Sequence, residues 1–210
     1  MTEEEKTEPL NKETKTFLLI AAAALFAILF VILFGFNGKP APTKLNTTEY
    51  NYYTFEQVGG LWQTTVKLDD KTYIAVFRFN PAQVKDVYVT GNFTGFKTEP
   101  IYVTFDPDAD PTQFKYLALA STELGLNVIR ALNFSMQSAC TKNLTDACKD
   151  RPIITCDTPN ASVIYLNPVP PTQITLTNHC VTLTGEGMDI MRSADRLLFQ
   201  WYKIMHATDL

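Results

Sequence analysis

The residues of this chain best suited to chemistry are its four cysteines, Cys140, Cys148, Cys156 and Cys180. Seven residues fill each of the first two gaps and 23 fill the third. A zinc site needs close pairs such as C-x2–4-C or histidines at helical spacing, and a thioredoxin-type redox centre needs C-x-x-C. Neither spacing occurs, so we expect two disulfides, which form in oxidising compartments. Of the three possible pairings we favour Cys140–Cys148 with Cys156–Cys180.

A catalytic cysteine is the alternative, because His179 stands beside Cys180. Neighbours on a strand point to opposite faces of a sheet, which argues against a thiolate–imidazole pair. The chain also lacks a G-x-S-x-G motif. The sequence therefore offers no recognisable catalytic residue and no cofactor-binding residue. We leave enzymatic activity open and lean against it.

Three alternating carboxylates, Asp106, Asp108 and Asp110, are the best candidates for a metal site. Alternating aspartates open an oxygen-rich calcium loop, but the turn glycine and the distal glutamate of the EF-hand pattern are missing here. Asp-Pro pairs are also common in turns and helix caps, and Asp110 followed by Pro111 fits a helix start. We expect a strand-to-helix turn and keep ion binding as the alternative.

A second acidic group lies near the C-terminus, where Asp189 and Asp195 alternate with Arg192 and Arg196. Two carboxylates can in principle share acid and base roles. Because residues three or four apart on a helix are neighbours, the simpler interpretation is ion pairing on a helix surface.

A membrane anchor is predicted over residues 17–36, which contain neither a charge nor a polar side chain. A helix of 20 residues spans about 30 Å, the thickness of the hydrocarbon core. The alternative is a cleaved signal peptide, whose apolar region is shorter, roughly 7–15 residues, and ends at a small-x-small site. We therefore expect a retained anchor that contacts the lipid bilayer, preceded by a short, disordered cytoplasmic tail over residues 1–16.

Orientation is indicated by three features. Three lysines precede the apolar run and two follow it closely, a weak positive-inside bias. All four cysteines lie beyond it. Sequons of the N-x-[ST] type occur at Asn46, Asn92, Asn133, Asn143 and Asn160, and we take all but Asn133 as glycosylation candidates. We predict a cytoplasmic N-terminus and an extracytoplasmic C-terminal part in the cell membrane.

The outer part is predicted to be an α+β domain over residues 50–210, separated from the anchor by a Pro/Thr-rich spacer over residues 37–49. β-branched and aromatic runs predict strands, and helical periodicity predicts two helices. The strands are expected at 62–68, 73–79, 86–90, 101–105, 163–166 and 172–185, the last being one long or two short strands, and the helices at 112–132 and 188–205. This order predicts one mixed sheet covered by two amphipathic helices, with a parallel crossover from 101–105 through the first helix to 163–166.

Charge narrows the range of partners. The formal net charge is −4, with 18 basic and 22 acidic residues and no polybasic run, so nucleic acid is not expected to bind. With 46% hydrophobic residues the chain is apolar enough to bury a core.

Several segments together resemble small, uncharacterised single-anchor membrane proteins of archaea. These segments are FRFNP (77–81), YVTFDPD (102–108), RPIITC (151–156), VIYL (163–166) and the long C-terminal run at 178–205. The resemblance covers about residues 50–205 and implies a disulfide-containing extracytoplasmic domain, but no activity and no catalytic residues.

The first hypothesis for function is a membrane-anchored binding or assembly module of the cell envelope, with an envelope or membrane protein as partner and no cofactor. The second is a metal-dependent envelope enzyme acting on sugar or peptide through Asp106, Asp108 or Asp110. The two differ in geometry, because ligands of a metal must converge whereas residues that cap turns need not.

Overall fold

The structure is a computed structural model that describes residues 11–34, 45–68, 70–131 and 133–206. Helix α1 (Lys12–Phe34) contains residues 17–34 of the predicted anchor, and residues 35–36 lie outside the described residues. Its window Lys12–Val31 is long and apolar enough to cross a membrane and is not buried. The prediction of a disordered tail is wrong for residues 12–16, where Thr16 Oγ1 donates to the Lys12 carbonyl at 3.0 Å as the helix begins. Residues 1–10 of that tail and 37–44 of the spacer lie outside the described residues.

The chain divides into two compact units, Met1–Lys44 and Leu45–Leu210. The second unit begins before the expected boundary at residue 50, because strand β1 (Asn46–Tyr50) occupies the end of the predicted spacer. Its polar sequence, NTTEY, gives little indication of a strand, but it pairs antiparallel with strand β2 (Tyr53–Val58) along its whole length.

An antiparallel meander of four strands opens the second unit. Strands β3 (Leu61–Leu68) and β4 (Lys71–Phe77) follow β1 and β2, and each strand pairs with the next along the chain. The predicted hairpin of residues 62–68 and 73–79 is thus confirmed. Residue 69 of its turn lies outside the described part of the chain.

A separate sheet of six strands has the order β5-β9-β10-β8-β6-β7. Its strands are β5 (Tyr88–Phe93), β6 (Ile101–Phe105), β7 (Met136–Cys140), β8 (Ser162–Asn167), β9 (Gln173–Asn178) and β10 (Cys180–Thr184). The prediction of a single sheet is therefore wrong, because the second unit contains two sheets, although the α+β class is correct. The parallel pairing of 101–105 with 163–166 is confirmed, and residues 172–185 form two strands. Strand β7 was not predicted.

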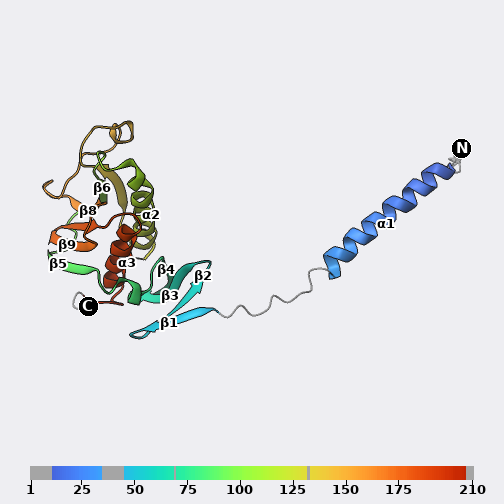
Figure 1. Ribbon diagram of the computed structural model, residues 1–210, viewed down its shortest axis with the longest axis horizontal. Helices are drawn as coiled ribbons and strands as arrows, with labels where there is room; N and C mark the ends of the chain where they lie inside the picture. Colours follow the sequence, from blue (N-terminus) through green and yellow to red (C-terminus); the bar gives the residue numbers. More distant parts are fainter. Residues whose placement is uncertain (1–10, 35–44, 69, 132, 207–210) are drawn as a thin grey trace, which may run out of the picture. The chain divides into compact units, whose positions relative to one another are not determined.

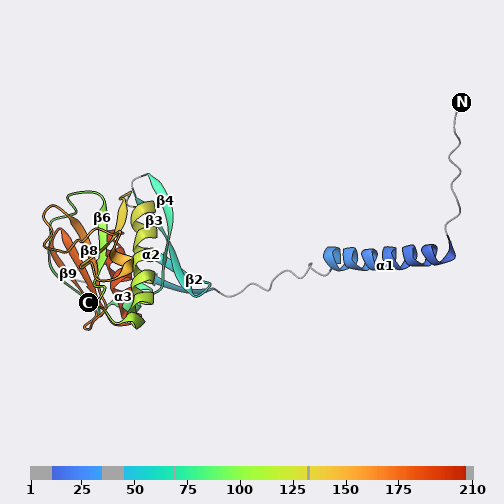
Figure 2. The same ribbon diagram turned by 90° about the horizontal axis from the view of Figure 1, so that it is seen from above.

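Two helices lie between the sheets, as Figures 1 and 2 show from two directions. Helix α2 (Phe114–Ala131) follows the short 3-10 turn η2 (Pro111–Gln113), and helix α3 (Asp189–Trp201) follows β10. The 3-10 turns η1 (Pro81–Val84) and η3 (Asp146–Cys148) lie in the connections after β4 and β7.

Most residues of helix α3 are buried because the helix has a sheet on either face. Phe199 contacts Phe77 of β4 with ring centroids 4.4 Å apart, while other residues of α3 contact β9 and β10. Asp195 and Arg196 are consequently fully buried. The prediction that both lie on a helix surface is wrong, because a single sheet was expected, whereas α3 has a sheet on either face.

Candidate functional site

Both favoured disulfides are present in the structure. Cys140 and Cys148 have an S–S distance of 2.00 Å, and Cys156 and Cys180 one of 2.03 Å. The first bridge ties η3 to the end of β7, and the second ties the loop after residue 151 to the start of β10. Because Cys180 is in a disulfide with Cys156, it does not provide a free thiol that could pair with His179.

Two of the three candidate metal ligands, Asp106 and Asp108, converge on a lysine, and the third, Asp110, is turned to a different partner. Lys142 Nζ contacts Asp106 Oδ2 at 3.1 Å and Asp108 Oδ2 at 3.0 Å. Asp110 instead caps η2, accepting hydrogen bonds from both the N–H and the hydroxyl of Thr112 at 2.8 Å. The described residues contain no group of three or more His, Cys, Asp or Glu side chains that could hold a metal ion.

The local electrostatics agree with this geometry. The pKa of Asp106 lies below its ordinary value: burial opposes the shift, but hydrogen bonds from the Asp108 N–H and from Lys142 outweigh it. Hydrogen bonds from Thr112 likewise lower the pKa of Asp110. Asp106 and Asp110 are therefore stabilised in their ionised form by donors from the protein itself.

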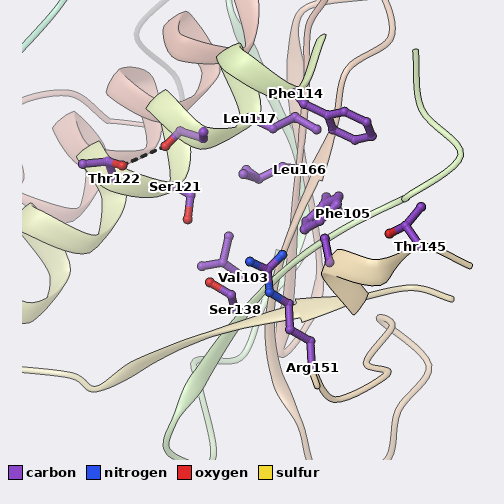
Figure 3. Close-up of a pocket in the computed structure, with 12 residues that line it drawn as sticks. Val103, Phe105, Phe114, Leu117, Ser121, Thr122, Ser138, Thr145, Arg151 and Leu166 are labelled. Atoms are coloured by element: carbon purple, nitrogen blue, oxygen red, sulfur yellow. Dashed lines mark hydrogen bonds between the residues drawn. The ribbon is translucent and has the colours of Figure 1, made fainter. Parts of the chain in front are cut away.

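A largely apolar groove lies between helix α2 and the disulfide-closed loop, with a volume of about 550 Å³ (Figure 3). That volume falls within the range of roughly 300–1,000 Å³ typical of small-molecule and cofactor sites. The apolar part of its lining consists chiefly of Val103, Phe105, Phe114, Leu117 and Leu166. Hydroxyls come from Ser121 and Thr122 of α2, from Ser138 of β7 and from Thr145 before η3.

The position of this groove follows from the fold. Strands β6 and β7 are parallel neighbours joined through α2, so the helix lies over them and their carboxyl ends open toward the loop that follows β7. Ligands of parallel sheets commonly bind outside these carboxyl ends. The Cys140–Cys148 bridge holds the loop there, so that Thr145 and Ala147 form one wall of the groove.

Arg151 is the only charged residue that lines the groove within the described part of the chain. Its guanidinium lies 5.8 Å from the centroid of the Phe105 ring, a distance that suits a cation–π contact. Figure 3 shows the side chain reaching from its loop toward Val103 and Ser138. None of the ion pairs formed between described residues involves Arg151. An apolar groove with one uncompensated cation suits an amphipathic anion.

A second hollow, of about 460 Å³, lies between β4 and α2 and contains Arg78 and Glu123 in its lining. Asp195 lies behind it. The Arg78 N–H donates to Glu123 Oε1 at 3.1 Å and to Asp195 Oδ2 at 3.0 Å, so the two carboxyl groups lie against each other. The Phe79 N–H also donates to Asp195 Oδ2, at 2.8 Å.

Burial, and then the neighbouring Glu123, raise the pKa of Asp195 well above its ordinary value. Two touching carboxyls that share a proton are a recognised acid–base arrangement, but buried structural pairs perturb pKa values in the same way. Here Asp195 is fully buried and caps the backbone at the end of β4, so the pair primarily joins β4, α2 and α3.

The sequons all lie on the surface. Asn46, Asn92, Asn133, Asn143 and Asn160 are exposed. Their use as glycosylation sites stays a prediction.

Neither Arg151 nor the Glu123–Asp195 pair was identified from the sequence as a functional residue. Arg151 begins the RPIITC segment, but only the fold brings it to a groove made by β6, α2 and β7. Glu123 and Asp195 are 72 positions apart, and no local spacing connects them.

No family model matches the sequence, and neither the curated proteins nor the solved structures contain a match to it. The resemblance to archaeal single-anchor proteins accordingly stays a prediction.

Proposed function

We propose that this chain is a membrane-anchored binding module of the cell envelope, and that the groove between α2 and the Cys140–Cys148 loop is its binding site. The observation that carries the proposal is an apolar groove of about 550 Å³ whose one charged lining residue, Arg151, lacks a carboxylate partner among the described residues. The anchor is helix α1, whose apolar length fits one membrane crossing.

An extracytoplasmic position of the second unit is part of this proposal. Two disulfides support it, because such bridges persist in oxidising compartments and are rare in the cytosol. In this orientation the short N-terminal segment is cytoplasmic and the binding groove faces the envelope. The expected partner is another envelope or membrane component, and nucleic acid is not among the expected partners.

The alternative of a metal-dependent enzyme loses the observation that motivated it. Asp106 and Asp108 are bound by one lysine and Asp110 caps a turn, so each of these carboxylates already has a donor from the protein. We therefore propose binding, with catalysis not required.

Photo-crosslinking in intact cells tests the proposal. p-Benzoylphenylalanine would replace Ser138 in β7 or Ala118 in α2, both of which line the groove. The exposed residues Lys67 and Thr177 provide control positions elsewhere on the second unit. We expect specific adducts of defined mass from the two groove positions and none of that mass from the controls.

A groove-filling variant sharpens the experiment. Ser121→Trp places an indole in the groove from α2, and Lys115→Trp places one on an exposed part of the same helix outside the groove lining. The adducts should disappear in the first variant and persist in the second. If groove and control positions give the same adducts, or none, the groove is not a binding site.

A further inference from the structure

The outer edge of strand β7 carries backbone groups that no described residue pairs with. In a strand, the backbone N–H and C=O groups of successive residues point alternately to the two edges, so the hydrogen bonds of odd- and even-numbered residues show which groups face outward. The Ile101 N–H donates to the Ser135 carbonyl at 2.9 Å and the Thr141 N–H to the Phe105 carbonyl at 3.0 Å, so odd-numbered residues here face β6. Even-numbered residues face outward, as Cys140 does when its N–H donates to the Pro152 carbonyl at 3.1 Å.

Ser138 has the same parity as Cys140, so its N–H and C=O also point away from β6. Strand β7 pairs in register with β6 alone, and none of the turn and loop hydrogen bonds between described residues reaches Ser138. Such an edge is a ready template for another extended chain. Because Ser138 also lines the groove, a strand added here would run directly beside it.

One end of this edge is already closed. The Pro152 carbonyl accepts from the Cys140 N–H, and the Ile154 N–H donates to the Cys140 carbonyl at 2.9 Å. These two hydrogen bonds form a parallel bridge between Cys140 and Ile153. In this register Pro152 lies opposite Ala139, so an added strand that runs parallel to β7 must stop before that position. It can accept from the Ser138 N–H and donate to the Met136 carbonyl, which has the same parity. Its final residue would lie next to Arg151, which directly precedes the closing segment.

Charge complementarity identifies what should end there. The carboxylates nearest in sequence to the end of β6, Asp106 and Asp108, are bound by Lys142, whereas Arg151 makes no ion pair with a described residue. A guanidinium binds a carboxylate through two parallel hydrogen bonds. The free carboxylate of a chain end suits a site where the chain cannot continue.

We propose that the groove binds the C-terminal segment of an extended peptide, which adds to β7 as a parallel strand, places an apolar side chain in the groove and ends with its carboxylate on Arg151. This inference rests on the proposed binding function and names its ligand class. Strand addition of this kind derives affinity from backbone hydrogen bonds and specificity from side-chain pockets. A lipid or fatty acid could fill the apolar space but would leave the edge of β7 unpaired.

The experiment uses the full chain in lipid nanodiscs and two pools of short synthetic peptides. The pools have the same randomised sequences ending in Leu, Val or Phe, one with a free C-terminal carboxylate and the other with a carboxamide. Retained peptides are identified by mass spectrometry, and a retained sequence is resynthesised with a fluorophore for anisotropy titration. We expect retention only from the carboxylate pool.

Variants test the two halves of the contact separately. Arg151→Gln should weaken the selected peptide by about tenfold or more, which corresponds to the loss of about 1.4 kcal/mol. Lys149→Gln removes the same charge from the same loop and should change the affinity by less than about twofold, because Lys149 pairs with Asp146 on the surface. N-methylation of the peptide N–H that would meet the Met136 carbonyl should abolish binding without any change in the protein.

Equal retention of both pools, or equal effects of the Arg151 and Lys149 variants, would overturn the peptide inference. If groove adducts form in cells but neither pool is retained, or if the adducts are lipids, the peptide inference fails while the binding function stands. Failure of the proposed function is distinct, because groove adducts would then be absent altogether.

Discussion

At the scale of single residues, the least expected feature is the contact between Glu123 and Asp195. A fully buried carboxyl is costly when ionised, and a second carboxyl beside it adds repulsion. Both accept from the Arg78 N–H, and Glu123 Oε2 also lies 3.2 Å from Arg78 Nε. Their arrangement is favourable when one proton is present on the pair.

This pair predicts a dependence of stability on pH. Because the pKa of Asp195 is raised in the folded protein, its contribution is fully present below the unfolded pKa of about 3.9 and is lost as the pH rises through the folded value. Asp195→Asn keeps an acceptor for Arg78 and Phe79 and turns an amide donor toward Glu123. We expect this variant to unfold with a free energy that is nearly independent of pH between 5 and 9, and to be at least as stable as the native chain at pH 8.

Asp195→Ala is the contrasting variant, since it leaves the two backbone N–H groups without their acceptor and should lose about 3 kcal/mol. Urea unfolding followed by tryptophan fluorescence measures both variants, because Trp62 and Trp201 are the chain's two tryptophans and lie in the second unit. Glu56→Gln, on the exposed face of β2, is the control. An unchanged pH slope in Asp195→Asn would show that Asp195 is ionised throughout.

At the scale of elements, periodicity predicted those strands and helices whose own residues carry the signal. IYVTF forms β6 at the predicted boundaries, and Asp110 caps the turn that leads into α2 as expected. Strand β7, with the sequence MQSAC, was missed because it lacks β-branched residues and is a strand by virtue of pairing with β6. Because β7 forms one edge of the groove, the groove could not be predicted without this strand. The burial of Asp195 was missed for a related reason, since no local pattern reveals a second sheet over α3.

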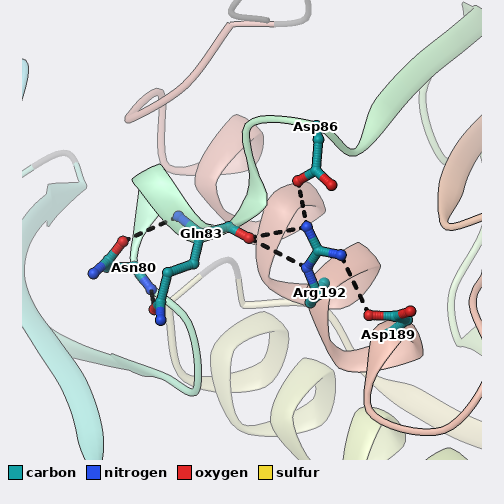
Figure 4. Close-up of polar contacts among 5 residues, drawn as sticks. All are labelled: Asn80, Gln83, Asp86, Asp189 and Arg192. Atoms are coloured by element: carbon teal, nitrogen blue, oxygen red, sulfur yellow. Dashed lines mark hydrogen bonds and ion pairs between the residues drawn. The ribbon is translucent and has the colours of Figure 1, made fainter.

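The Arg192 side chain of helix α3 hydrogen-bonds to η1 (Figure 4). Its guanidinium contacts Asp86, donates to the Gln83 carbonyl at 3.1 and 3.2 Å, and contacts Asp189 at 3.3 Å. Hydrogen bonding to Arg192 outweighs the effect of partial burial and lowers the pKa of Asp86. The turn η1 is itself fixed by a capping box, in which Asn80 and Gln83 each accept from the other's N–H.

We predict that Arg192→Gln lowers the free energy of unfolding by about 1–2 kcal/mol, because the Gln83 carbonyl and Asp86 lose their shared donor. Asp189→Asn is the matched control: it weakens only the contact within the helix and should cost less than about 0.5 kcal/mol. The same urea titration measures both variants. If the two variants were equally stable, Arg192 would be no more than a surface charge.

At the scale of the whole molecule, the proposal depends on which side of the membrane the second unit occupies. Helix α1 fits one crossing, and the disulfides favour an oxidising compartment for residues 140–180.

Single engineered cysteines test this orientation with a membrane-impermeant maleimide. We expect Thr177→Cys, at an exposed position of β9, to be labelled in intact cells, and Thr7→Cys to be labelled only after permeabilisation. In the native chain, all four cysteines should react only after reduction under denaturing conditions. Labelling of Thr7→Cys but not Thr177→Cys in intact cells would reverse the orientation, and the groove would then face the cytoplasm, where bridges such as Cys140–Cys148 are rarely maintained.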